Sequence, residues 1–155
     1  MRLKERSIKK EDITAFLLTI DVNERKNLII LINSDGTLCR MGSGAYDNTD
    51  TELYYGKVKE PLLKNLINEM THDIFEFQGQ YILSLDGTPC RILLKLYNEK
   101  EMVIYEFIYG SKFQGLPDEI RNVLAAALSL TEDWYQQQQM LPKAESVSDR
   151  NQESL

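Results

Sequence analysis

The sequence predicts an α+β fold, in which one antiparallel β-sheet of about six to seven strands carries two amphipathic helices on one face. Short runs rich in β-branched and aromatic residues are separated by tight polar turns, as is typical of antiparallel strands. Two longer segments repeat apolar residues every three or four positions, as amphipathic helices do. The order β-β-β-β-α-β-β-β-α lacks the regular strand and helix alternation of doubly wound nucleotide-binding folds.

Four strands are expected before the first helix. Residues 13–22 alternate in hydrophobicity and favour a strand, although a helix over residues 11–18 fits the same letters. The polar stretch 23–27 would turn the chain into the continuous apolar run LIILIN, which is typical of a central strand. A DG turn and a polar loop would then bound two shorter strands, at residues 37–41 and 52–58.

The second half is expected to add a helix, three strands and a second helix. Pro61 favours the start of a helix that runs to about Phe77 with a broad apolar stripe. Three strand-like runs, at residues 81–85, 90–97 and 101–109, would follow as an antiparallel meander. Pro117 and the two acidic residues after it favour a second helix, which should fade near Gln138.

The length of 155 residues fits a single core, because two fragments of half that size would each bury little apolar surface. We expect a flexible basic arm over residues 1–12, one α+β domain over residues 13–139 and a disordered tail over residues 140–155. The last 14 residues are polar apart from Val147 and Leu155, which leaves the tail little to bury.

Charge and hydropathy exclude several classes of partner. The chain carries 24 acidic against 18 basic residues, and its basic residues cluster only in the first ten positions, so a nucleic-acid-binding surface is disfavoured. No apolar run reaches the roughly 18 residues of a membrane span, and the start of the chain lacks the apolar region of a signal peptide. We therefore expect a cytoplasmic protein that binds neither nucleic acid nor membrane.

Catalytic, metal and cofactor chemistry finds little support in the residue types. Two cysteines and one histidine are too few for a structural zinc site. His72 lies on the expected polar face of the first helix, away from a thiol that it could activate. The GSG at residues 42–44 has no third glycine, and the acidic stretch 47–52 lacks the spacing of a calcium loop. The sequence thus predicts no catalytic residue, no metal and no cofactor.

One motif occurs twice: SDGTLCR at residues 34–40 returns as LDGTPCR at residues 85–91. The repetition fits either an internal duplication or two ordinary hairpin turns, because DG is a common hairpin signal. Strand phase predicts that Cys90 is buried with its aliphatic neighbours and that Arg91 lies at the surface. By analogy Arg40 would also point outward. A disulfide between the two cysteines is not expected in a cytoplasmic chain.

Glu106 interrupts an aliphatic row in the last expected strand, with Met102, Ile104 and Ile108 as its companions. Two interpretations stay open. The row could be the thinly covered outer side of the sheet, with Glu106 in water. Alternatively, Glu106 could be a buried carboxylate with a raised pKa, paired to an arginine or to Lys95.

The resulting functional expectation is a small non-catalytic domain that binds a partner protein or a second copy of itself. The strand over residues 101–109, last in the meander, is expected at a sheet edge, where its aromatic face would bind a partner unless the second helix buries it. The alternative is a small-molecule site or an enzyme site between the loop at residues 42–51 and the sheet. The candidate binding residues are Arg40, Tyr46, Tyr54, Tyr55, Arg91, Tyr105, Glu106 and Tyr109.

Overall fold

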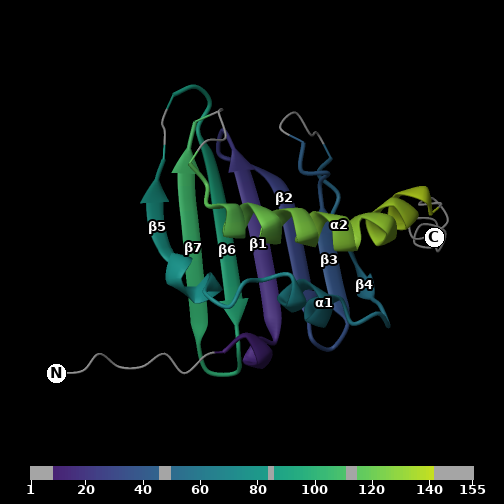
Figure 1. The fold of residues 1–155 in the computed structure, drawn as a ribbon. Coiled ribbons are helices and arrows are strands. Elements are labelled where there is room, and N and C mark those ends of the chain that lie inside the picture. The colour runs from purple at the N-terminus through teal and green to yellow at the C-terminus, as the bar shows by residue number, and fades with distance from the viewer. Residues whose placement is uncertain (1–8, 46–49, 84–85, 111–114, 142–155) are drawn as a thin grey trace.

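The computed structural model describes residues 9–45, 50–83, 86–110 and 115–141. Within these ranges the chain forms one seven-stranded β-sheet with two α-helices on one of its faces (Figure 1). The predicted α+β class and the single sheet are confirmed. No helix in the described ranges is long and apolar enough to cross a membrane.

The sheet runs in the order β4-β3-β2-β1-β6-β7-β5. Its strands are β1 (Ala15–Val22), β2 (Arg25–Asn33), β3 (Thr37–Met41), β4 (Tyr54–Lys57), β5 (Gly79–Ile82), β6 (Cys90–Tyr97) and β7 (Met102–Tyr109). The helices are α1 (Leu62–Asn68) and α2 (Asp118–Met140), with 3₁₀ turns η1 (Lys10–Asp12) and η2 (Ile74–Phe77). Most predicted strands therefore lie where the hydrophobic pattern put them.

The sheet departs from a meander at β5. This strand pairs in parallel with β7, whereas all the other neighbours are antiparallel, so the connection from β5 to β6 passes across the end of β7. At that end Gly110 lies so close to the Asp86 carbonyl that no side chain would fit. The expected edge position of the last strand is wrong, because β7 has β6 on one side and β5 on the other.

The first helix is shorter than its apolar spacing predicts. It ends at Asn68, and the chain resumes a helical turn only at η2. Between them the Thr71 hydroxyl donates a hydrogen bond to the Asp73 carboxylate, a local bond of the kind that competes with helical structure. The apolar stripe still reaches the core, because Leu66 and Ile74 are both fully buried.

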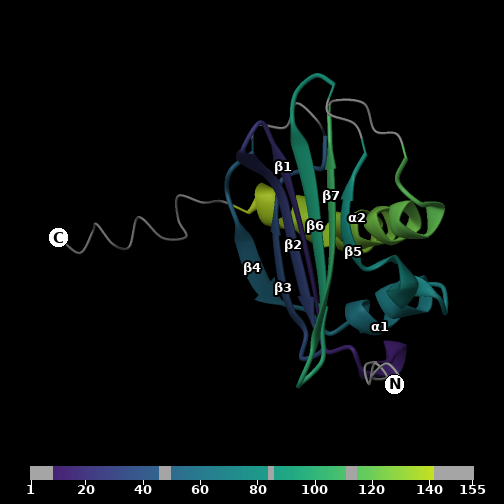
Figure 2. The same ribbon diagram turned by 90° about the vertical axis from the view of Figure 1, so that its left-hand side faces the viewer.

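The core lies between the sheet and the helices, which Figure 2 shows gathered on one side of the strands. The inner side of β7 supplies its aromatic part: the ring of Phe107 stacks on Tyr81 at 4.9 Å, and the Tyr105 hydroxyl donates a hydrogen bond to the Ile74 carbonyl at 3.0 Å. Tyr105, Phe107 and Tyr109 are all buried, so the helices cover the aromatic face that the sequence offered as a binding surface.

Part of the expected N-terminal arm contacts the domain. Residues 10–12 form η1, and the Lys10 ammonium donates a hydrogen bond to the Met70 carbonyl at 2.6 Å. Residues 1–8 and 142–155 lie outside the described residues, so the arm and the tail otherwise remain predictions.

Candidate functional site

The face of the sheet that points away from the helices has no described helix or strand over it (Figure 2). We call it the open face; it consists of the outward side chains of the seven strands, which alternate with the buried ones. Its apolar members are Ala15, Leu17, Ile29, Leu31, Cys39, Met41, Tyr55, Ile82, Leu93, Tyr97, Met102, Ile104 and Ile108.

A row of five apolar side chains and one lysine crosses six strands of the open face at right angles to them; we call it the apolar row. The strand registers place the following residues abreast, from β4 to β7: Tyr55, Cys39, Leu31, Leu17, Lys95 and Ile104. Tyr55 is 73% exposed and Ile82, on the outermost strand β5, is 64% exposed. The middle members of the row, Cys39, Leu31 and Leu17, are partly exposed. Apolar surface that stays accessible across a sheet in this way marks interaction sites in soluble proteins.

A charged network borders the apolar row. The Arg91 guanidinium lies between two carboxylates: its Nε donates to Glu106 Oε2, and its Nη1 is 3.7 Å from Asp21 Oδ2. The Lys26 ammonium lies 2.9 Å from Asp21 Oδ1, and the Gln80 amide donates to Glu106 Oε1 at 2.8 Å. Both carboxylates of the open face are therefore engaged within it.

The structure agrees with part of each interpretation of Glu106. Its side chain lies on the outer side of the sheet, as the first interpretation proposed, and it pairs with Arg91, as the second proposed. However, hydrogen bonds from Arg91 and then Gln80 hold the pKa of Glu106 below its usual value, so the raised pKa of the second interpretation is wrong. A carboxylate held ionised in this way is a fixed negative charge rather than a proton donor.

Arg40 occupies the opposite face from the one expected. It is fully buried, and all five of its N–H groups have partners in the protein. These partners are the carbonyls of Gly42, Ser43 and Leu128, the Thr131 hydroxyl and the Glu132 carboxylate, at 2.9 to 3.5 Å. The guanidinium carbon also lies 4.3 Å from the centre of the Tyr135 ring. No donor is left for a ligand, so Arg40 joins the loop after β3 to α2.

The aromatic neighbours of Arg40 serve the same attachment. The Tyr135 hydroxyl accepts a hydrogen bond from the Gly42 amide and donates one to Asp50 Oδ2, each at 3.0 Å. Burial and the Asp50 bond raise the pKa of Tyr135 to about 12. Tyr54 packs edge-on against Tyr135, with 5.7 Å between ring centres. Of the residues expected to form the small-molecule site, Arg40 and Tyr54 thus contact α2, whereas Tyr55 lies exposed on the open face; Tyr46 lies outside the described residues.

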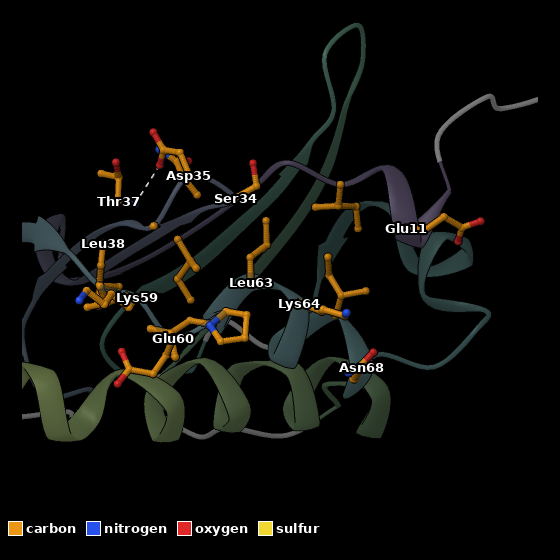
Figure 3. Close-up of a pocket in the computed structure, with 18 residues that line it drawn as sticks. Glu11, Ser34, Asp35, Thr37, Leu38, Lys59, Glu60, Leu63, Lys64 and Asn68 are labelled. Carbon is orange, nitrogen blue, oxygen red and sulfur yellow. Dashed lines mark hydrogen bonds between the residues drawn. The ribbon is translucent and has the colours of Figure 1, made fainter.

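A cavity of about 570 Å³, which the sequence analysis did not predict, lies on the helix side between the β2–β3 turn and α1 (Figure 3). Its lining combines apolar residues such as Leu38 and Leu63 with a rim of both charge signs: Glu11, Asp35, Lys59, Glu60 and Lys64. The first DG turn forms one wall, where the Thr37 amide donates to Asp35 Oδ1 at 2.9 Å. Three distant segments build this cavity, so no local motif could have indicated it.

The two DGT motifs have different settings. The first joins the adjacent strands β2 and β3, as a hairpin should, whereas the second joins β5 and β6, which are separated by β7. Cys39 lies on the open face and Cys90 is buried in the core, so both thiols are free and on opposite sides of the sheet. Burial raises the pKa of each thiol, which disfavours a reactive thiolate at either position.

Comparison with known proteins adds no assignment: neither the models of known families nor the curated proteins contain a match to this chain. Among the described residues, no three histidine, cysteine, aspartate or glutamate side chains are arranged to hold a metal ion.

Proposed function

We propose that the chain is a non-catalytic interaction domain that binds a partner protein on the open face of its sheet. The observation that carries this proposal is the apolar row across six strands of a face that no described helix or strand covers. Four large apolar side chains of this face are exposed: Tyr55, Ile82, Met102 and Ile104.

The outward residues of β2 support the same proposal. An antiparallel sheet with one solvated face normally alternates apolar inward residues with polar outward ones. Here β2 places Ile29 and Leu31 outward beside the buried Ile30, so both of its faces are apolar. Burial of such a second face against a partner would add a hydrophobic contribution that the monomer lacks.

The alternative was a small-molecule site beside the loop at residues 42–51 that uses an arginine. Arg40, the arginine nearest to that loop in sequence, instead bonds to groups of the protein itself. A site there would have to take a donor of the buried Arg40 guanidinium away from one of its present partners, which would leave that partner unsatisfied. Protein binding on the open face needs no such rearrangement.

Site-specific photo-crosslinking in the cells that make the protein tests the proposal. A photoreactive amino acid replaces Ile104 on the open face in one variant and Ala125 on the exposed side of α2 in the control. We expect discrete adducts with a second protein from position 104 and none from position 125. Equal adducts from both positions, or none from position 104, would contradict the proposal.

A second variant shows whether the apolar row itself does the binding. Leu31→Glu places a charge in the middle of the row without touching the helix-facing core. We expect at least about a tenfold loss of affinity for the crosslinked partner, the usual scale for a central interface residue. Thermal unfolding of the variant checks that the fold persists.

A further inference from the structure

We infer that the occupant of the open face is an acidic amphipathic helix of the partner protein, laid across the strands. This inference rests on the proposed function and specifies the chemistry of the partner. It follows from the direction of the apolar row, the sign of the charge on the open face and the position of one lysine.

The row has the direction and length that a helix requires. Six strands at the usual spacing of about 4.8 Å place its ends about 24 Å apart, the length of about 16 helical residues. On the covered face α2 itself crosses the strands in this way (Figure 1). An extended peptide along a strand would instead meet the row at one point only.

The open face has the opposite charge balance from the chain as a whole. The full sequence has six more acidic than basic residues. The outward strand positions instead carry four basic side chains, Lys26, Lys57, Arg91 and Lys95, against two acidic ones, Asp21 and Glu106. A partner with excess carboxylates would be attracted to this face and weakly repelled by the rest of the surface.

Lys95 indicates where on the open face the partner should place a carboxylate. It lies within the apolar row between Leu17 on β1 and Ile104 on β7, and it is half-buried there. Among the described residues, Lys95 makes no ion pair. A partner that covers Leu17 removes water from the Lys95 ammonium, and a carboxylate of the partner offsets this cost more fully than a neutral acceptor does.

The same geometry disfavours a second copy of this chain bound through the same face. The two carboxylates that a second open face would bring are already held by Arg91, Lys26 and Gln80. Two such faces would therefore bury Lys95 on each side with no free carboxylate opposite. A different protein, with aspartate or glutamate beside its apolar stripe, satisfies Lys95 without breaking this network.

Three stapled helical peptides of 18 residues provide the test. They share one leucine stripe and differ only in the residues that flank it, which are all glutamate, all glutamine or all lysine. Fluorescence anisotropy with the full chain, at low and high salt, gives the affinities. We expect the glutamate peptide to bind about tenfold more tightly than the glutamine peptide at low salt, with the difference shrinking at high salt.

Charge reversal assigns the preference to one residue. Lys95→Glu should make the lysine peptide the tightest binder, while the matched control Lys64→Glu, on the exposed side of α1, should leave the order unchanged. The photoreactive group at position 104 should crosslink the bound peptide, which places it on the open face.

The possible failures separate the two proposals. Equal binding of the glutamate and glutamine peptides, with crosslinking from position 104, would overturn the acidic partner but keep the docking surface. No binding of any peptide, with no adducts in cells, would overturn both. A dimer in sedimentation equilibrium that Leu31→Glu dissociates would identify a second copy as the occupant and overturn this inference.

Discussion

Arg40 and Arg91 close the same six-residue pattern, DGT-x-CR, but lie on opposite faces of the sheet. Arg40 is fully buried under α2, while the Arg91 side chain is 42% exposed on the open face. The surrounding pairing makes the difference: β3 continues directly from a hairpin between neighbouring strands, and β6 begins only after Pro89, beyond a connection that passes β7. Which face a side chain takes therefore depends on pairing with other strands and not on the motif.

The two environments assign different tasks to one residue type. The Arg40 guanidinium donates its hydrogen bonds to groups of the loop after β3 and of α2, and the α2 groups are close to it only in the folded chain. The outer one links Asp21 and Glu106 across three strands in contact with water. Substitutions on the inner face should therefore affect folding, and substitutions on the open face should affect binding.

The largest contrast is expected between neighbours on one strand. Tyr105→Ala empties a fully buried site and removes the hydrogen bond to the Ile74 carbonyl, so we expect a loss of about 4 kcal/mol in the free energy of unfolding. Ile104→Ala, one residue away on the open face, should cost less than about 1 kcal/mol. Urea unfolding of both variants measures the difference. Similar losses would mean that the open face is covered in the folded monomer.

The two arginines should differ by a smaller amount. Arg40→Met leaves Glu132 and three carbonyls without their donor, and we expect it to cost about 3 kcal/mol. Arg91→Met should cost less than about 1 kcal/mol, because a partly exposed ion pair contributes little. The same urea measurements apply. If Arg91→Met proved the more destabilising variant, the assignment of folding to the inner face would fail.

Local patterns predicted the fold well where neighbours in sequence are also neighbours in space. The strands at residues 37–41 and 90–97 have the predicted bounds, since each alternates cleanly and follows a turn. The position of β5 was not predictable in this way. It pairs with residues about 26 positions later, and nothing in its four residues selects β7 over β6.

The candidate site was predicted only in part, for the same reason. The outward direction of Arg91 follows from strand alternation and was predicted. The burial of Arg40 depends on Thr131 and Glu132, which are about 90 residues away on α2. The sequence also offered the aromatic face of β7 for binding, because alternation separates two faces but does not say which one the helices cover.

The smallest predicted effect is on the pH dependence of stability, which should differ between Glu106 on the open face and Tyr135 on the helix-covered face. Glu106 has a lowered pKa in the folded chain, so its ion pair stabilises the protein above the usual pKa of 4.5, and this contribution is lost as the pH falls below that value. Tyr135 has a raised pKa of about 12, so its contribution is present below about 10 and is lost as the pH rises from 10 toward 12.

Unfolding free energies measured from pH 2.5 to 11.5 should therefore separate two variants. Glu106→Gln should reduce the loss of stability at acid pH by less than about 1 kcal/mol and leave the alkaline part of the curve unchanged. The effect is small because the ion pair with Arg91 is partly exposed to water. Tyr135→Phe should do the reverse: it lowers the plateau, since the Gly42 amide loses its acceptor, and it flattens the alkaline limb. An acid limb that Glu106→Gln leaves unchanged would show that the network around Arg91 does not stabilise the folded chain. The role left for these charged groups would then be the binding of a partner.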